Sequence, residues 1–445
     1  MKLPEQFITH MKILLNEEFP EFENALHTKS PVSIRINPNK NTNGFNLNKT
    51  DQIPWCPSGY YLTERPSFTL DPFFHAGHYY VQEPASMFLE FILNSLKVPK
   101  KCNVLDLCSA PGGKSTLLLS YFSEDAFVHC HEFDPHRAKV LKQNLERWGT
   151  NNTFVSQGSL EQLSNSSMRY KIILVDAPCS GEGMFRKEPE ALKQWSPQKV
   201  KACTHMQQNI LKVADALCET GGYIIYSTCT YNSEENEQQL EPYVQDGRFK
   251  SIQIPNQFAQ EYLEKHVYVY RFFPHKLSTE GLTISVIQKQ QEQSSINLKL
   301  KSAVSKFNKE FNPVEWINNS TAYQIIPVRE LFYAVHQNQL EQFAYLNSFL
   351  RFSGGAIPVC QMKGIAIYPE HGLALSIHLN QHIYKCELDL KDALNFLRAT
   401  YAPLNKEINA KWILAIYKSA CLGWFKVNQN GLKNYFPINQ RIRNY

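Results

Sequence analysis

The middle of the chain alternates short apolar runs with helical stretches, and this pattern restricts the possible folds more than any other feature. Each run is continuous and bounded by turn residues, at 103–107, 127–130, 171–175 and 222–226. Helical periodicity occupies the intervals between them, at 113–122, 136–148 and 197–219. Buried strands separated by helices are typical of a parallel sheet covered on both faces. The sequence therefore predicts a doubly wound α/β domain over about 66–287.

The rest of the chain predicts smaller units around this domain. Because single hydrophobic cores stop growing near ~250–300 residues, a chain of 445 residues should hold two or three domains. We expect a small accessory region at 1–65 and a linker at 288–309, where Gln, Lys and Ser predominate. Residues 310–445 contain short β-like runs such as 364–368 and 373–377, which predict one or two small α+β or β-barrel modules.

Composition excludes several classes of protein. The 11 cysteines include no C-x-x-C pair, so neither a disulfide framework nor a zinc ribbon is expected, and no metal site is predicted. The N-terminus does not read as a signal peptide, and no segment approaches the ~18 consecutive apolar residues of a membrane span. We therefore expect a cytoplasmic protein with reduced thiols. A formal net charge of +5 tolerates a polyanionic partner without demonstrating one.

A glycine-rich segment follows the first predicted strand, at the sheet edge where ligands bind in open α/β folds. It reads Asp106-Leu107-Cys108-Ser109-Ala110-Pro111-Gly112-Gly113-Lys114-Ser115. Two adjacent glycines let the backbone approach a ligand closely, and the spacing is not that of a phosphate-binding P-loop. A plain tight turn would explain an isolated Gly-Gly pair equally well, so this segment alone is weak evidence.

Acidic residues follow the second predicted strand, in His131-Glu132-Phe133-Asp134. An acid at this place can accept hydrogen bonds from the ribose hydroxyls of S-adenosylmethionine or NAD. It can equally be the N-cap of the next helix. We favour Glu132 as the ligand and Asp134, which precedes Pro135, as the cap.

Two cysteine-bearing segments follow later strands of the same predicted sheet. They read Val175-Asp176-Ala177-Pro178-Cys179-Ser180-Gly181 and Tyr226-Ser227-Thr228-Cys229-Thr230. A lone cysteine is usually buried and inert, but the carboxyl ends of parallel strands meet at one edge of the sheet. Cys179, Cys229 and Asp176 are therefore predicted to share one cleft with the glycine-rich segment.

Together with Ser33-x-Arg35-x-Asn37-Pro38 and Gln82-Glu83-Pro84-Ala85-Ser86, these segments resemble the Sun-domain family of RNA (cytosine-5) methyltransferases. The resemblance is greatest to the bacterial branch that modifies small-subunit ribosomal RNA and carries a C-terminal PUA-like module. It implies a Rossmann-like methyltransferase domain, an N-terminal accessory RNA-binding region, and C-terminal α+β and PUA-like β-barrel modules.

The resemblance also implies a cofactor and a role for each site residue. S-adenosylmethionine would be held at its ribose by Glu132, and at its methionyl end by Cys108, Ser109, Ala110, Pro111, Gly112, Gly113 and Lys114. Asp176 would lie near both the cofactor and the base. Cys229 would be the nucleophile, and Cys179 would help to release the product.

The chemistry of cytosine accounts for these residue types. Carbon 5 is a poor nucleophile until a thiolate adds at carbon 6, which creates an enamine that can take a methyl group. Asp176 suits the proton or hydrogen bond needed at the N3 side of the ring, and Cys179 suits the later removal of the carbon-5 hydrogen. Cys229 must reach the thiolate form at neutral pH, which predicts a nearby positive charge such as Lys114.

The implied substrate is a cytosine of 16S ribosomal RNA, within the 30S subunit or its precursor; neither DNA nor a membrane is an expected partner, and we expect a monomer. Base chemistry needs an unpaired or flipped nucleotide. Lys426, Lys433, Arg441 and Arg443 would either grip RNA or be ordinary solvated charges. Two rival hypotheses are a methyltransferase that acts on transfer RNA and a non-catalytic RNA-binding assembly factor.

Two segments depart from the family pattern. Family members usually carry an acid after the third strand, where this chain reads Gln157-Gly158-Ser159, so adenine would need Ser159 or backbone groups. The usual Gly-Glu-Gly-His-Phe stretch is replaced by 278–282, and different substrate contacts are expected there. The segment 431–437 matches the family's closing segment, which favours an intact C-terminal module.

Overall fold

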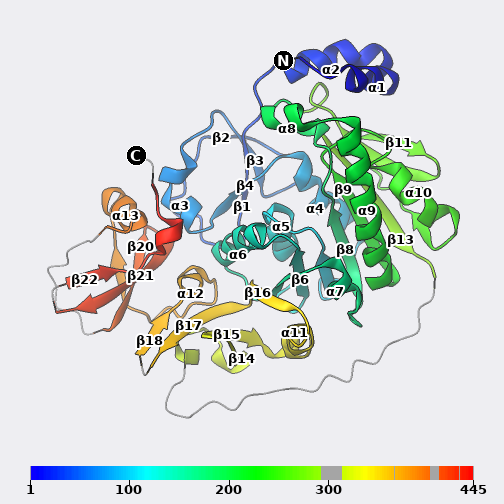
Figure 1. Ribbon diagram of the computed structural model, residues 1–445. Helices are drawn as coiled ribbons and strands as arrows, with labels where there is room; N and C mark the ends of the chain where they lie inside the picture. Colours follow the sequence, from blue (N-terminus) through cyan, green and yellow to red (C-terminus); the bar gives the residue numbers. More distant parts are fainter. Residues whose placement is uncertain (1, 292–312, 365, 401–409, 430, 444–445) are drawn as a thin grey trace.

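The computed structural model of the protein describes residues 2–291, 313–364, 366–400, 410–429 and 431–443 (Figure 1). A ten-stranded sheet forms its centre. The strands at the middle of this sheet run parallel, in the order β7 (Thr153–Gln157), β6 (Phe127–Glu132), β5 (Asn103–Asp106), β8 (Tyr170–Asp176) and β9 (Cys218–Thr228). Strand order reverses at β5, so the predicted doubly wound arrangement is confirmed.

Antiparallel strands extend this sheet at both edges. Beyond β9 lie β13 (Leu282–Lys289), β12 (Val267–Phe272) and β11 (Gln260–Glu264), and β10 (Phe249–Ser251) pairs with β13. Beyond β7 lies β16 (Arg351–Gly355), so the chain after residue 310 contributes a strand to the central sheet. Strand β13 continues into the segment predicted as a linker. Most of that segment, 292–309, lies outside the described residues.

Helices cover both faces of the sheet because its buried strands present apolar side chains to each side. Along β8, Ile172 and Leu174 belong to one core, and Ile173 and Val175 belong to the other. The first core contains α4 (Phe88–Leu96), α5 (Gly113–Tyr121) and α6 (Pro135–Trp148). The second contains α7 (Leu160–Ser164), α9 (Pro197–Leu217), α10 (Glu237–Gln245) and α11 (Leu340–Asn347). No helix of the described residues combines the length and apolar character needed to cross a membrane.

Two N-terminal helices, α1 (Glu5–Leu15) and α2 (Phe19–Leu26), pack on the loops that follow β8 and β9. The rings of Phe7 and Phe185 meet edge to face at 5.0 Å, and those of Phe22 and Tyr231 at 5.5 Å. Helix α8 (Pro189–Gln194) lies beside them (Figure 1). These aromatic contacts buttress two loops that carry predicted site residues.

The N-terminal part continues as a four-stranded antiparallel sheet and α3 (Pro72–His75), which extend past the predicted end of the accessory region at residue 65. Its strands lie in the order β2 (Lys49–Gln52), β3 (Gly59–Leu62), β1 (Ser33–Ile36) and β4 (Tyr79–Val81). Arg35 of β1 is fully buried and docks this sheet on α5. Its guanidinium donates to Gln82 Oε1 at 2.8 Å and to Thr116 Oγ1 at 2.6 Å, and it lies 4.5 Å from the ring of Trp148.

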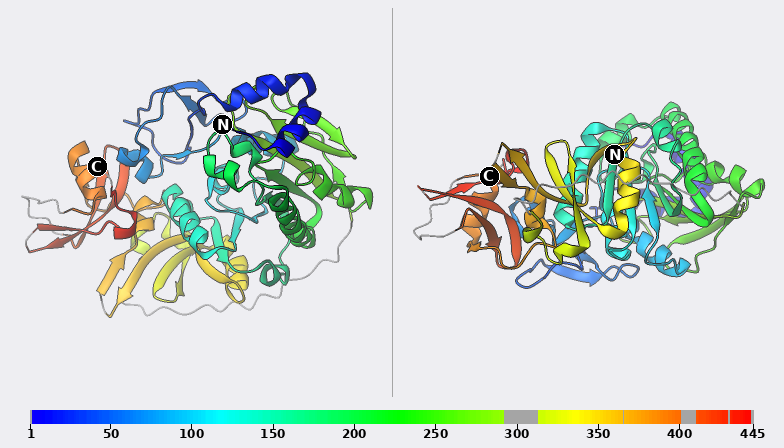
Figure 2. Two further views of the ribbon diagram at one scale, coloured as in Figure 1. Left: turned by 45° about the horizontal axis from the view of Figure 1, so that its top comes forward. Right: turned by 90° about the horizontal axis from the view of Figure 1, so that it is seen from below.

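The C-terminal part contains two further sheets. In Figure 2 the orange-red sheet lies at one end of the molecule, and the yellow sheet lies between it and the green part of the chain. One consists of β14 (Tyr323–Val328), β15 (Leu331–His336), β17 (Ile357–Lys363) and β18 (Ala366–Pro369). The other consists of β19 (Lys385–Glu387), β20 (Trp412–Tyr417), β21 (Ala420–Asn428) and β22 (Gly431–Asn434), with α13 (Leu390–Leu397) beside it.

The expectation of a strand-like run at 373–377 is wrong, because the segment forms α12 (His371–Leu375). Gly372 to Leu375 are all buried, between β17, β21 and α6. A short apolar run that is buried on all sides shows no periodicity, so sequence alone does not distinguish a helix from a strand there.

Arg35→Met should lower the free energy of unfolding by about 2–4 kcal/mol, because Gln82 and Thr116 each lose a buried hydrogen-bond partner. Equilibrium guanidinium unfolding measures the change. Arg329→Met, at an exposed position between β14 and β15, is the matched control and should cost less than about 0.5 kcal/mol. Equal losses in the two variants would contradict the docking role of Arg35.

Candidate active site

The glycine-rich segment forms the turn between β5 and α5, as predicted. Gly112 has a φ of 109°, a left-handed conformation that glycine adopts without strain. A Cβ atom at Gly113 would lie 3.3 Å from Cε1 of Tyr80, closer than an ordinary contact. The second glycine therefore lets the turn lie close against β4.

A cavity of about 160 Å³ opens beside this turn. Among the predicted cofactor residues, Gly112 and Glu132 lie outside its lining. Several residues of the Gln82–Ser86 segment line it, although the sequence analysis gave them no role in the site. The lining consists of Tyr80, Val81, Gln82, Glu83, Ser86, Asp106, Cys108, Ser109, Ala110, Pro111, Gly113, Lys114 and Asp176.

Asp106 ends β5 at the wall of this cavity and is almost fully buried. Ser115 Oγ donates to its Oδ2 at 2.6 Å, whereas its Oδ1 has no partner among the described residues. Burial raises the pKa of Asp106 to about 7, against the opposing hydrogen bond from Ser115. A buried carboxylate with a free oxygen in a cavity wall is suited to a cationic group. Its position at the strand end was the only sequence signal for this role.

The two acids after β6 have different roles. Asp134 accepts hydrogen bonds from the backbone N–H groups of His136 and Arg137, each at 2.8 Å, and so caps α6 as predicted. Glu132 is fully buried, and its carboxylate accepts a hydrogen bond from the Ala110 backbone at 3.2 Å. Glu132 therefore braces the glycine-rich turn in this structure and does not face the cavity.

Lys114 and Asp176 form an ion pair at the mouth of the cavity. Lys114 Nζ lies 2.7 Å from Asp176 Oδ1, and Ser227 Oγ donates to the same oxygen at 2.8 Å. Burial alone would lower the pKa of Lys114, but the charge of Asp176 and their hydrogen bond raise it above its ordinary value. Lys114 thus stays charged, and it also interacts electrostatically with Cys229.

The two predicted thiols meet at the ends of β8 and β9. The Sγ atoms of Cys179 and Cys229 lie 2.8 Å apart, and the Cys229 backbone N–H donates to Cys179 Sγ at 3.2 Å. The hydrogen bond with Cys229, together with burial, raises the pKa of the Cys179 thiol well above its ordinary value. Cys179 therefore keeps its proton at neutral pH. The structure brings the two thiols together at the strand ends that also carry Asp176. Asp176 lines the cavity beside the glycine-rich turn, whereas the lining includes neither thiol.

Two buried carboxylates join the loops that carry these thiols. Glu182, in the loop of Cys179, accepts from the backbone N–H groups of Tyr231 at 2.9 Å and Asn232 at 3.1 Å. Glu235, in the loop of Cys229, accepts from the backbone N–H of Ser180 at 2.9 Å. Each acid thus fixes the loop of the other. Helix α10 begins at Glu237, so Glu235 lies in the loop that precedes it.

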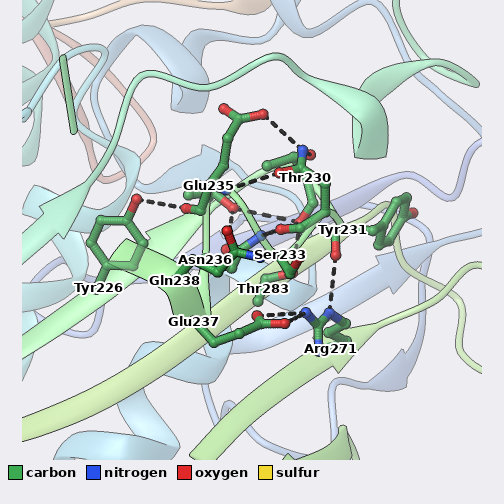
Figure 3. Close-up of polar contacts among 12 residues, drawn as sticks. Tyr226, Thr230, Tyr231, Ser233, Glu235, Asn236, Glu237, Gln238, Arg271 and Thr283 are labelled. Atoms are coloured by element: carbon green, nitrogen blue, oxygen red, sulfur yellow. Dashed lines mark hydrogen bonds and ion pairs between the residues drawn. The ribbon is translucent and has the colours of Figure 1, made fainter. Parts of the chain in front are cut away.

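Further polar contacts hold the Cys229 loop from β12 and β13 (Figure 3). Arg271 pairs with Glu237 at 2.7 Å and donates to the Tyr231 carbonyl at 3.2 Å. Thr283 Oγ1 donates to the Thr230 carbonyl at 2.6 Å. This loop is therefore held on several sides.

The segment 278–282, which departs from the family pattern, packs against the Cys179 loop. Glu280 pairs with Arg186 at 3.1 Å, and both side chains are buried. Gly281 N–H donates to the Gly183 carbonyl at 3.1 Å. A Cβ atom at Gly281 would lie 2.4 Å from the Gly183 Cα, so only glycine allows this approach.

Other predicted contacts lie away from the cavity. Ser159 caps α7, where its Oγ accepts from the Gln162 backbone at 3.3 Å, so its hydroxyl already has a partner. In the C-terminal sheet, Lys426 lies 5.0 Å from the Tyr368 ring and faces Lys433 across the β21–β22 pair. Lys433, Arg441 and Arg443 are exposed. A role of these basic residues in gripping RNA stays a prediction.

The cavity at the strand ends of a doubly wound sheet, with an acid and a glycine-rich turn in its wall, is the architecture of an S-adenosylmethionine-dependent methyltransferase. More specifically, the chain belongs to the family of 16S rRNA methyltransferases RsmB/F, whose family model matches residues 94–288. Models for the N-terminal domain of 16S rRNA methyltransferase RsmF and for the RsmF PUA domain match 3–84 and 384–442. The predicted family, enzyme class and cofactor are confirmed.

Relatives with curated names support this membership. Ribosomal RNA small subunit methyltransferase F of Aliivibrio fischeri (strain MJ11) is 30% identical, over 73% of each chain. The protein of the same name from Vibrio cholerae (strain M66-2) is 25% identical, over 98% of this chain and 97% of its own.

Solved structures share the fold. A methyltransferase homolog protein from Pyrococcus horikoshii has a TM-score of 0.56 at 24% identity, covering 64% of this chain and 95% of that chain. NSun6 from Pyrococcus horikoshii, solved with SFG, has a TM-score of 0.55 at 19% identity, covering 65% of this chain and 99% of that chain.

Asp106→Asn should raise Tm at pH 8 and change it much less at pH 5. Because burial raises the pKa of Asp106 from 3.8 to about 7, the folded protein binds more protons than the unfolded chain between these values. Stability then falls as pH rises through this window. The amide cannot ionise, so the variant escapes this loss. Thermal unfolding at both pH values measures the effect.

Asp134→Asn is the contrasting variant. Backbone hydrogen bonds, chiefly from Arg137, lower the pKa of Asp134, so its charge stabilises the folded protein at neutral pH and its removal should lower Tm at pH 8. A fall in Tm at pH 8 for both variants would contradict the claim that ionised Asp106 destabilises the folded protein.

Proposed function

We propose that this enzyme transfers a methyl group from S-adenosylmethionine to carbon 5 of a cytosine in 16S ribosomal RNA, through a covalent bond between Cys229 and the base. The observation that carries the proposal is the 2.8 Å approach of the Cys179 and Cys229 sulfurs, at the same strand ends as Asp176. Nucleophilic attack needs one thiol. Release of a base that is still bonded to the enzyme gives the second thiol a purpose.

The residues around the cavity fit S-adenosylmethionine. Its ammonium group needs an acceptor, and Asp106 Oδ1 is buried without a partner among the described residues; its carboxylate needs a donor, and Gln82 Nε2 is likewise buried and unpartnered. The turn from Cys108 to Lys114 would hold the methionyl end. Glu132 would shape that turn through its bond to Ala110, and its remaining acceptor capacity would hold the ribose hydroxyls. When bound, the cofactor supplies the methyl group.

Cys229 would add its sulfur to carbon 6 of the cytosine, which makes carbon 5 nucleophilic. Lys114 is the nearby positive charge that interacts electrostatically with Cys229. Asp176, held by Lys114 and Ser227, would keep a proton or a hydrogen bond at the N3 side of the ring.

Cys179 would act only after Cys229 has bonded to the base. In the free protein, Cys229 raises the pKa of Cys179 through their hydrogen bond and its charge. A sulfur bonded to carbon carries no charge, so the pKa of Cys179 should then fall and its own proton can pass to solvent. The thiolate of Cys179 can take the carbon-5 proton. The electron pair restores the ring double bond, the carbon–sulfur bond breaks, and the Cys229 thiolate returns.

The finer choice of substrate rests on the relatives. They are named for the small ribosomal subunit, which supports 16S RNA in the 30S subunit or its precursor over transfer RNA. Methyl transfer to isolated 30S subunits, compared with transfer to tRNA, separates these substrates. We also propose that the enzyme acts as a monomer.

Cys229→Ala should abolish transfer of radiolabelled methyl groups to RNA, because it removes the proposed nucleophile for carbon 6. Cys179→Ala should attack and methylate but release its product slowly, so that a protein–RNA adduct survives denaturing electrophoresis. Cys102→Ala, which removes a half-buried thiol distant from the site, is the control and should keep wild-type turnover. An adduct formed by Cys229→Ala, or normal turnover of Cys179→Ala, would contradict these roles.

A further inference from the structure

A second and larger cavity, of about 500 Å³, lies between the N-terminal sheet and α6. It adjoins the proposed cofactor cavity, because Tyr80 and Val81 of β4 line both. Ligand pockets in proteins commonly span ~300–1,000 Å³, so this cavity has room for a nucleotide. The mechanism above gives it no function.

The walls of this cavity are aromatic and basic. The Arg147 guanidinium lies 4.5 Å from the Phe74 ring, and the Arg65 guanidinium lies 5.4 Å from the Phe68 ring. Within the described part of the chain, neither guanidinium pairs with a carboxylate, and no acidic residue lines the cavity. Aromatic rings stack on unpaired bases, and guanidinium groups bind phosphates.

A chain of hydrogen bonds connects this cavity with the glycine-rich turn. Arg147 donates to Asn144 Oδ1, and Asn144 Nδ2 donates to the Pro111 carbonyl at 2.6 Å. Tyr80, the residue shared by both cavities, donates to the same carbonyl at 3.5 Å. Arg147 therefore lies two hydrogen bonds from the turn that carries Gly112.

We propose that this cavity binds an unpaired nucleotide of the substrate RNA that neighbours the target cytosine. Its base would stack on the half-buried rings of Phe74 and Tyr80, and its phosphate would lie between Arg65 and Arg147. The positive, acid-free lining favours a polyanion, and the shared wall of Tyr80 and Val81 places this nucleotide next to the proposed cofactor cavity, which Asp176 also lines. The inference rests on the proposed function, since it names a second contact of the same RNA.

Binding of a short, fluorescein-labelled single-stranded RNA, measured by anisotropy over a range of salt concentrations, tests the inference. Arg65→Gln should weaken binding roughly fivefold and reduce the slope of log Kd against log salt by about 0.7, the loss expected for one phosphate contact. Phe74→Leu should weaken binding roughly tenfold with little change in this slope. The KM for S-adenosylmethionine should stay unchanged in both variants.

The control is Arg329→Gln, which removes the same charge from an exposed turn and should bind as wild type. Arg65 is exposed, so its substitution leaves the fold intact. Wild-type binding by both Arg65→Gln and Phe74→Leu would overturn the inference while RNA methylation, and with it the proposed function, stood. If both variants bound 30S subunits more weakly than wild type but bound the oligonucleotide equally well, the inference would also be overturned. The cavity would then bind a ribosomal protein instead of RNA. Failure of the wild-type enzyme to methylate RNA would refute the proposed function. The binding comparison would still show whether this cavity binds RNA.

Discussion

The position of both thiols depends on two buried carboxylates that each bind the other's loop. Glu182 accepts from backbone N–H groups that follow Cys229, and Glu235 accepts from the one that follows Cys179. Hydrogen bonds to an ionised acceptor are about twice as strong as neutral ones, and a buried carboxylate that lost them would be strongly destabilising. Any arrangement that separates the loops would break both sets at once. The short distance between the sulfurs is therefore a property of the scaffold.

The surrounding elements pack on the two thiol loops and hold them in place. The aromatic side chains of α1 and α2 cover Tyr231 and Phe185, and the Arg271–Glu237 pair holds the start of α10 against β12. On the other side of the cavity, Arg35 fixes the accessory sheet to the helix that begins at the glycine-rich turn. The N-terminal region thus completes the site, and the second cavity arises where its sheet meets α6.

The sequence predicted the features that depend on local patterns. Strands β5, β6, β8 and β9 were found because buried parallel strands are continuously apolar, and the edge that carries the site residues was found because the carboxyl ends of these strands meet there. The role of Glu182 in joining the two loops was not predicted, because its partner Tyr231 lies 49 positions away. The contact of Glu132 with the glycine-rich turn was not predicted either, because an acid at this position has the same sequence context whether it binds a ligand or the turn. Strand β16 was assigned to a separate module because nothing local reveals pairing with β7.

The most direct measurement of the central claim is the site of covalent attachment. RNA containing 5-fluorocytosine cannot lose a proton from carbon 5, so the enzyme should remain bonded to the base after methyl transfer. Digestion with trypsin separates the peptide of Cys179, 172–186, from that of Cys229, 213–248. Mass spectrometry should find the nucleotide on the peptide of Cys229. A nucleotide on the peptide of Cys179, or no adduct in the presence of S-adenosylmethionine, would contradict the account.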